Sequence, residues 1–288
     1  MIFRTDLALE AAEEEDEDGV FTSVEPQGDC TVTRVKILPS ASRRVGKPAG
    51  TYITAEFPPF SDHVRDSDQD ITLLSEELRA LLPDGPILVA GLGNRDITPD
   101  ALGPKAADRI LATRHVRKEL ARVAGMENLR AVSVLVPGVL GDTGIETAEA
   151  LEIMVSRLHP AGVIAIDALA ARSLRRLGNT VQISDSGIAP GSGIGNMRPP
   201  LSRETLGVPV IGVGVPTVVS GSTFAADLLG ADDHDREALS RIIAPTDNIM
   251  VTVREVDLLI SRASDLVAMA VNLALNPGFT ADEYARLA

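Results

Sequence analysis

The chain has 288 residues, of which 44% are hydrophobic, so it is long enough to bury a sizeable core. Its formal net charge of −14 argues against direct binding to nucleic-acid phosphates, and it has no apolar run of roughly the 18 residues that a membrane span needs. Its single cysteine excludes an intramolecular disulfide and a cysteine-rich metal site. We therefore expect a cytoplasmic protein that binds neither nucleic acid nor membrane directly.

The N-terminal part of the chain, residues 1–28, is expected to form a mobile leader outside the core. It contains six consecutive acidic residues, Glu13 to Asp18, which are typical of a solvated segment. After it, Thr31 to Leu38 and Gly50 to Phe57 alternate apolar and polar residues, which predicts two half-buried strands joined by a loop over 39–49. These strands would form a small extra β element.

Strands and helices then alternate along the chain, as they do in parallel βαβ units. The predicted strands are Ile87–Ala90, Ala131–Val136, Gly162–Ile166, Thr180–Ser184 and Val208–Val213. The predicted helices are Ser75–Leu82, Ala101–Val123, Glu146–Leu158, a helix that begins at Phe224, and Glu255–Leu275. The fold class is therefore expected to be α/β, with a mostly parallel sheet in a single domain over 29–288.

Polar residues follow two of these predicted strands at the point where each strand ends. Asn94, Arg95 and Asp100 come after the first strand, and Asp167 comes directly after the third. Because the carboxyl ends of parallel strands lie along one edge of a sheet, we expect the two aspartates to meet there. Two facing carboxylates can share one proton, so that one deprotonates a water while the other polarises a carbonyl. From spacing alone, capping of a helix or loop by each aspartate stays open as the alternative.

Two other aspartates stand in triplets, Asp142 in D-T-G and Asp185 in D-S-G, that resemble those of pepsin-like proteases. Those enzymes are all-β, whereas strands and helices alternate here, so turns and the wall of an active site are the favoured interpretation. The loop P-G-S-G-I-G-N resembles a phosphate-binding loop through Gly191, Gly193 and Gly195. It neither follows a predicted strand nor precedes a predicted helix, so we expect an irregular loop near the site.

The sequence predicts no metal and no cofactor. Its four histidines lack the paired spacing that is typical of a metal site. Oxygen ligands from Asp100, Asp142 and Asp167 could still hold a hard cation, and this alternative stays open.

Five segments of the chain closely resemble the spore germination proteases, the endopeptidases that degrade small acid-soluble spore proteins. The segments are G-L-G-N-R-D-I-T-P-D-A-L-G-P (Gly91–Pro104), P-G-V-L-G-D-T-G-I-E-T-A-E (Pro137–Glu149), I-A-I-D-A-L-A-A-R (Ile164–Arg172), L-G-N-T-V-Q-I-S-D-S-G-I-A-P-G-S-G-I-G-N (Leu177–Asn196) and G-V-P-T-V-V (Gly214–Val219). The resemblance implies a three-layer α/β/α sandwich similar to that of the hydrogenase maturation endopeptidases. It also implies that Asp100 and Asp167 are the catalytic pair, and that the protein is a homotetramer in the forespore or spore core.

The same resemblance implies a zymogen that removes its own N-terminal residues, cutting after an acidic residue and before a hydrophobic one. The stretch R-T-D-L-A has this form, so processing is expected between Asp6 and Leu7, with residues 1–28 holding the propeptide and the acidic segment. The implied substrates are small acid-soluble spore proteins, cut after Glu or Asp.

Several polar residues are candidates for binding the substrate or forming the wall of the site, and the arginines among them would recognise its acidic side chain by charge. They are Asn94, Arg95, Asp142, Arg172, Asp185 and Arg198. Two other functions stay open. One is a metal-dependent peptidase of the hydrogenase-maturation type that uses Asp167 as a ligand, and the other is a protein-binding module without catalysis.

Overall fold

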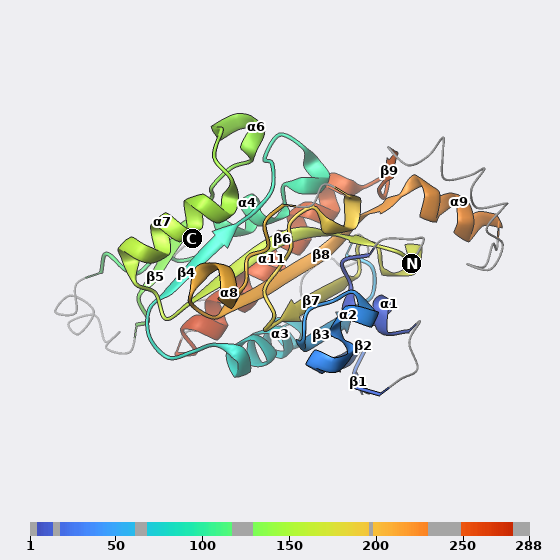
Figure 1. The fold of residues 1–288 in the computed structure, drawn as a ribbon, viewed down its shortest axis with the longest axis horizontal. Coiled ribbons are helices and arrows are strands. Elements are labelled where there is room, and N and C mark those ends of the chain that lie inside the picture. Colours follow the sequence, from blue (N-terminus) through green and yellow to red (C-terminus); the bar gives the residue numbers. More distant parts are fainter. Residues whose placement is uncertain are drawn as a thin grey trace.

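A single mixed sheet runs through the protein in the computed structural model (Figure 1). The residues described by the structure are 5–13, 18–60, 68–116, 129–195, 198–229 and 249–278. Within them the strand order is β1-β2-β3-β7-β8-β6-β4-β5, and β9 pairs with β8. The strands are β1 (Val20–Gln27), β2 (Cys30–Ile37), β3 (Gly50–Glu56), β4 (Ile87–Gly91), β5 (Val132–Leu135), β6 (Gly162–Ala171), β7 (Thr180–Ser184), β8 (Val210–Ser220) and β9 (Met250–Val251).

The prediction of an α/β fold is confirmed, but the sheet is mixed rather than mostly parallel. Strands β5, β4, β6 and β8 pair in parallel, whereas β1, β2, β3 and β7 join the sheet through antiparallel pairs that end at β8. The length of the connection explains the antiparallel pairing of the first two strands. Only two residues, Gly28 and Asp29, separate β1 from β2, and so short a turn can join only antiparallel strands.

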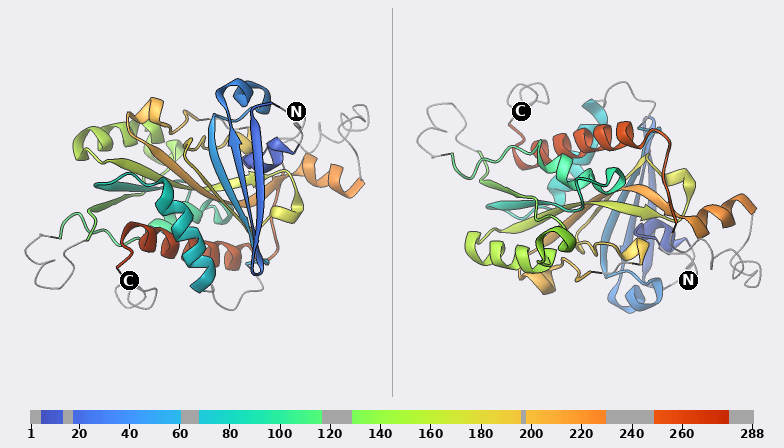
Figure 2. Two further views of the ribbon diagram at one scale, coloured as in Figure 1. Left: turned by 90° about the horizontal axis from the view of Figure 1, so that it is seen from below. Right: turned by 90° about the horizontal axis from the view of Figure 1, so that it is seen from above.

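Helices cover both faces of the sheet, as the two views in Figure 2 show. The helices are α1 (Ala8–Ala12), α2 (Pro39–Val45), α3 (Asp68–Leu81), α4 (Leu102–Ala107), α6 (Leu140–Thr143), α7 (Thr147–Leu158), α8 (Arg203–Leu206), α9 (Gly221–Leu229) and α11 (Val256–Leu275). Successive residues of a strand point to opposite faces. Accordingly Ile87 and Val89 pack in the cluster that includes α3, α4 and α11, while Leu88 and Ala90 pack in the cluster that includes α7 and α8.

Helix α11 is the one helix in the described part of the chain that is long and apolar enough to cross a membrane. Most of its residues are buried inside the protein, among them Leu259, Ile260, Val267 and Val271. These residues belong to the same cluster as the strand residues of the sheet. The apolar character of α11 is therefore that of a core helix.

The N-terminal stretch packs on the sheet, which is contrary to the prediction of a mobile leader. The side chains of Leu7 and Ala8 are 0% exposed, and Ala8 and Leu9 pack with β2 and β3 residues. Strand β1 pairs with β2 along its whole length. All but the first residue of β1 are exposed, so this strand lacks the apolar alternation by which a strand is recognised in a sequence. The burial of Leu7 could not be predicted either, because it depends on residues far along the chain. Most of the acidic run, residues 14–17, lies outside the described residues.

Several predicted elements have other bounds in the structure. Helix α3 begins seven residues before the predicted Ser75, strand β8 runs on to Ser220 instead of ending at Val213, and helix α9 begins at Gly221 instead of Phe224. The predicted loop over 39–49 contains helix α2, with Pro39 in its first turn and the left-handed Gly46 at its end. Of the predicted helix Ala101–Val123, the structure has only the short α4, which follows a 3₁₀ turn at Thr98–Asp100, and the residues from 117 on lie outside the described residues. Strand β6 continues to Ala171, because β8 pairs with it that far. Asp167 therefore lies within a strand and not after one.

Candidate active site

Asp100 is held at the carboxyl end of β4 by the turn that follows this strand. The backbone N–H of Asn94 donates a hydrogen bond to the Asp100 carboxylate, with an N to Oδ2 distance of 2.7 Å. The turn needs glycine at position 93, because Gly93 has φ of +107° and a Cβ atom there would lie 2.1 Å from the carbonyl oxygen of Asp100. The G-L-G-N stretch thus fixes the position of the first aspartate.

Asp167 reaches the same edge from the middle of β6, where it pairs with Gly214 of β8. Its side chain is 5% exposed, and the backbone N–H of Ala168 donates to its Oδ1 at 2.9 Å. Strand β4 accompanies β6 only as far as the pair of Gly91 and Ile166. Asp167 therefore stands at the point where β6 runs on without β4.

The two aspartates line one cavity of about 450 Å³ and are electrostatically coupled. Burial raises the pKa of Asp167 well above its usual range, and the negative charges of Asp100 and Asp6 raise it further. Burial also raises the pKa of Asp100, and the hydrogen bond from Asn94 partly offsets this effect. Such a pair can hold one proton on one carboxyl group while the other stays ionised, which is the arrangement for general acid and base chemistry.

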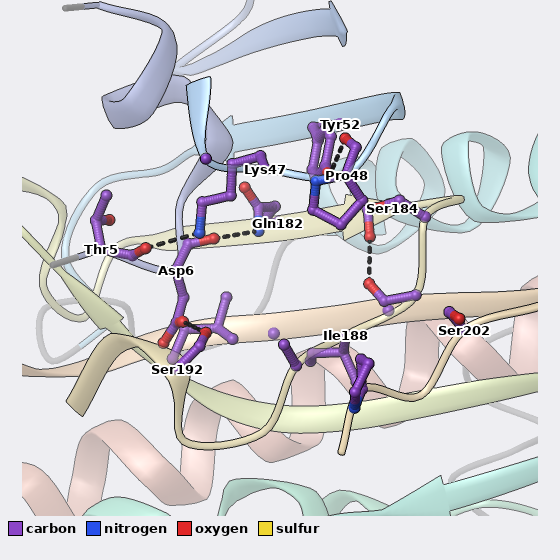
Figure 3. Close-up of a pocket in the computed structure, with 18 of the residues that line it drawn as sticks. Thr5, Asp6, Lys47, Pro48, Tyr52, Gln182, Ser184, Ile188, Ser192 and Ser202 are labelled. Atoms are coloured by element: carbon purple, nitrogen blue, oxygen red, sulfur yellow. Dashed lines mark hydrogen bonds between the residues drawn. The ribbon is translucent and has the colours of Figure 1, made fainter. Parts of the chain in front are cut away.

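The N-terminal segment brings a third acidic residue, Asp6, into this cavity. The Asp6 N–H donates to the carbonyl oxygen of Ala170 at 2.8 Å, and the Ala170 N–H donates to Oδ2 of Asp6 at 2.8 Å. The hydroxyl of Ser192 donates to the other carboxylate oxygen, Oδ1 (Figure 3). The next residue, Leu7, is fully buried against Leu169 and Val219. An acidic and a hydrophobic side chain are thus held side by side along β6.

Further contacts fix the segment on either side of Asp6. The Asp6 carbonyl oxygen accepts from Nε2 of Gln182 at 3.2 Å, and Oε1 of Gln182 accepts from the Ala8 N–H at 2.7 Å. Lys47 donates from Nζ to the carbonyl oxygen of Thr5 at 2.7 Å, and burial lowers the pKa of its ammonium group (Figure 3). Thr5, Lys47 and Gln182 line a neighbouring cavity of about 570 Å³, which also includes Asp6.

Glu10 anchors the segment from inside the protein. Its side chain is fully buried, and its carboxylate accepts from the backbone N–H groups of Arg172 and Ser173 at 2.7 and 2.9 Å. The guanidinium group of Arg176 lies 3.3 Å from Oε1 of Glu10 and forms a second ion pair with Glu13. The first helix is therefore tied to the loop after β6 by buried charged groups.

The other residues predicted from the sequence divide between the cavity and its surroundings. Asn94 and Arg198 line the cavity, and Arg198 also forms an ion pair with Glu146 at 3.2 Å. Arg95 instead points to the surface, where its guanidinium group makes two hydrogen bonds with the carboxylate of Asp108. Arg172 does not line the cavity.

The two aspartates of the D-T-G and D-S-G triplets also lie outside the cavity. Asp142 is exposed in α6, although its neighbours Leu140 and Gly141 line the cavity. Asp185 is exposed, and its Oδ1 accepts from the Thr51 N–H at 2.7 Å, which is a turn contact. Within the residues that the structure describes, no three histidine, cysteine or acidic side chains lie close enough to hold a metal ion together.

The sequence predictions did not include Ser192, Ala170, Gln182, Lys47 or Glu10 as residues of the site. Most of them contact residues 5–8, and their positions in the sequence are up to 186 residues away. Only Ser192 carried a local signal, because it stands in the glycine loop P-G-S-G-I-G-N. The prediction of an irregular loop is confirmed, since Ser192–Ile194 forms a single 3₁₀ turn. This turn lies beside Asp6.

Comparison with known proteins identifies the family. The family model described as germination protease matches residues 2–231. The chain belongs to the germination protease family. It is 42% identical to a germination protease of Caldanaerobacter subterraneus over 99% of this chain and 97% of the relative. It is 36% identical to one of Clostridium perfringens over 97% of each chain, and 35% identical to one of Priestia megaterium over 95% of this chain and 93% of the relative.

Membership in the germination protease family confirms the resemblance drawn from the five sequence segments. The protein is a peptidase, a hydrolase of peptide bonds that belongs to spore germination, and its substrates are proteins. The cavity that holds Asp100 and Asp167 is the candidate place for this hydrolysis, since it combines two coupled carboxyl groups with a bound segment of polypeptide.

Proposed function

We propose that the protein is an aspartate-dependent endopeptidase, made as a zymogen, whose catalytic residues are Asp100 and Asp167. It cleaves small acid-soluble spore proteins after Glu or Asp and before a hydrophobic residue, and it removes its own first residues by cleavage between Asp6 and Leu7. One observation carries the proposal: Asp6, Asp100 and Asp167 line the same cavity. A chain that holds its own acidic and hydrophobic residues beside two coupled carboxyl groups has the arrangement of an enzyme with a bound substrate.

In this mechanism Asp100 is the base and Asp167 is the acid. Asp167 is the more deeply buried of the two, and the charges of Asp100 and Asp6 favour its protonated form. Asp100 is partly exposed, and its ionised form is stabilised by the Asn94 N–H. Asp100 is therefore ionised and Asp167 is protonated before the reaction begins.

The chemical steps conserve the single proton of the pair. The Asp100 carboxylate takes a proton from a water, the water oxygen bonds to the scissile carbonyl carbon, and Asp167 donates its proton to the carbonyl oxygen. In the second step Asp100 gives its proton to the amide nitrogen while the C–N bond breaks. Asp167 takes back a proton from the hydroxyl of the collapsing intermediate, so the pair returns to its starting state.

The bound N-terminal segment also supports the zymogen. Asp6 occupies part of the cavity in the uncut chain, and the buried contacts of Leu7 and Glu10 hold it there. A substrate chain cannot occupy the same backbone groups of Ala170 until Asp6 has left. The uncut chain is therefore expected to be inactive toward other proteins.

We further propose that the protein works as a homotetramer in the cytoplasm of the forespore and later in the spore core. The support for this part is the resemblance of the five sequence segments, which cover most of the chain, to proteins with those properties. Native mass spectrometry of the purified chain tests the assembly, and fractionation of sporulating cells tests the location.

Replacement of Asp167 tests the mechanism. The Asp167→Asn variant should keep the fold but lose both the shortening of its own N-terminus, measured by intact-mass spectrometry, and the cleavage of a small acid-soluble spore protein. Asp29→Asn, in the exposed turn between β1 and β2, is the matched control and should behave as the unaltered protein. Near-normal activity of Asp167→Asn would contradict the proposal.

The two alternative functions predict other results. Loss of activity after exhaustive chelation would favour the metal-dependent peptidase, and a wild-type chain that never shortens would favour the protein-binding module.

A further inference from the structure

We propose that Ser192 and the backbone N–H of Ala170 form the subsite that recognises the acidic side chain before the scissile bond. This inference rests on the proposed function, since it takes the bound segment around Asp6 as a substrate in place. The subsite is made of hydrogen-bond donors without a formal charge, so it differs from the arginine recognition that the sequence predicts.

The two carboxylate oxygens of Asp6 each have their own donor. Oδ2 accepts from the Ala170 N–H at 2.8 Å, and Oδ1 accepts from the Ser192 hydroxyl. The Asp6 N–H in turn donates to the Ala170 carbonyl oxygen at 2.8 Å, so the backbone of the bound residue is fixed by the same residue that contacts its side chain. This is how a peptide adds to the free edge of a strand, with main-chain bonds for affinity and side-chain pockets for specificity.

The sheet makes this edge available only beyond the catalytic aspartate. Strand β4 pairs with β6 up to Gly91 and Ile166, and Ala170 lies past that pair on β6. The pairing of β6 with β8 changes register between Leu169 and Ala170, at the position where Asp6 binds. The residue left without a partner at this shift is Thr217 of β8, since Leu169 pairs with Pro216 and Ala170 with Val218. Irregular pairing of this kind is common next to active sites.

The loop after β7 closes the subsite from the other side. A Cβ atom at Gly193 would lie 2.3 Å from Oδ2 of Asp6 and 2.7 Å from Cβ of Ala170. The carboxylate therefore rests directly on the backbone of position 193. The backbone φ of Gly193 lies outside the left-handed region, so other residues could adopt it. Glycine is needed here because there is no space for a side chain.

The predicted arginines are engaged elsewhere. Arg95 is bound to Asp108 at the surface, and Arg172 does not line the cavity. Arg198 lines the cavity but forms an ion pair with Glu146. Lys47 also favours a negative charge in this subsite from farther away, since its ammonium charge and the charge of Asp6 attract each other. Donors aimed at both oxygens favour an ionised carboxylate over an amide, because hydrogen bonds to charged groups are roughly twice as strong as neutral ones.

The test uses the protein after self-processing, which begins at Leu7, and synthetic peptides that match residues 1–12 of the uncut chain, with either Asp or Asn at position 6. The value of kcat/KM is measured for both peptides. The unaltered enzyme should prefer the Asp peptide, and Ser192→Ala should reduce this preference about tenfold, mainly by slowing cleavage of the Asp peptide. Ser192→Thr keeps the hydroxyl and should restore the preference. Ser156→Ala, on the exposed side of α7, is the matched control and should leave both values unchanged.

The outcomes separate this subsite from a merely structural anchor and from the proposed function itself. An unchanged preference in Ser192→Ala overturns the subsite, even if the variant processes its own N-terminus slowly. An unaltered enzyme that cleaves both peptides equally also overturns it, while leaving the proteolytic function standing. An unaltered enzyme that cleaves neither peptide overturns both.

A second variant keeps the test decisive if Ser192→Ala does not fold. Gly193→Ala fills the space of the bound carboxylate and should lower kcat/KM for the Asp peptide at least tenfold in a variant that still unfolds cooperatively, although the contact of its Cβ with Cβ of Ala170 lowers the thermal unfolding temperature. Unchanged cleavage of the Asp peptide by a folded Gly193→Ala variant overturns the subsite.

Discussion

Asp100 and Asp167 lie on different elements but line one cavity, and the charge of Asp100 raises the pKa of Asp167. Burial is the larger cause of that shift, and Asp6 adds to it. The titration of Asp167 is therefore a direct probe of whether its neighbours carry charge.

The first prediction concerns this coupling. Asp100→Asn removes one negative charge near Asp167, so the pKa of Asp167 should fall toward its usual range while burial keeps it raised. The measurement is a pH titration of carboxyl-labelled protein by NMR, with Asp29→Asn as the control that leaves the value unchanged. A pKa of Asp167 that does not move in Asp100→Asn contradicts the coupling.

The second prediction concerns stability. Because the pKa of Asp167 is raised in the folded state, the folded protein binds more protons than the unfolded chain between the unfolded and the folded pKa, and Asp167 destabilises the fold as pH rises through this window. Asp167→Asn removes this cost, and the Asn carbonyl oxygen can still accept from the Ala168 N–H. The variant should unfold at a higher temperature than wild type at pH 7, and the difference should shrink as pH falls from the raised folded pKa toward the unfolded pKa of about 4, below which it should vanish. A variant that is less stable at pH 7 would refute the prediction.

The third prediction concerns the turn that holds Asp100. Gly93→Ala combines a strained positive φ with a clash against the Asp100 carbonyl oxygen, and it should lower the free energy of unfolding by about 2 kcal/mol or more and abolish peptidase activity. The control is Gly207→Ala, which has φ of +73° and nothing within 4 Å of its added Cβ, so it should cost only about 1 kcal/mol. Denaturant unfolding and peptide cleavage measure the two effects. Equal costs for both variants would show that the close approach to Asp100 is unimportant.

The fourth prediction concerns Glu10. In Glu10→Gln an amide NH₂ group replaces the carboxylate oxygen that accepts from the Ser173 N–H and the Arg176 guanidinium group. These buried donors lose their acceptor, so the variant should have a free energy of unfolding lower by about 2–4 kcal/mol. Glu25→Gln breaks an exposed ion pair with Arg34 and should cost less than about 1 kcal/mol. Denaturant unfolding of the two variants compares them. A Glu10→Gln variant as stable as Glu25→Gln would show that the buried network contributes little.

Local pattern was sufficient for much of the sheet. Strands β2, β3, β4 and β7 were predicted within one residue at each end, because apolar alternation or a short buried run marks them. Strand β1 was missed because nearly all of its residues are exposed. Helix α2 was missed although Pro39 and Gly46 mark its two ends, since its seven residues are too few for a clear helical period.

The sequence by itself determined the family, the α/β class and the placement of Asp100, because these depend on residues close together in the chain: a buried strand, a glycine turn and an aspartate. It also pointed to Asp6 and Leu7 as an acidic and hydrophobic pair. Only the tertiary structure decided what these residues contact. Asp6 meets Ala170 and Ser192 because β6 outruns β4 and a distant loop folds back over its edge, and such contacts between remote segments leave no period or spacing in the sequence.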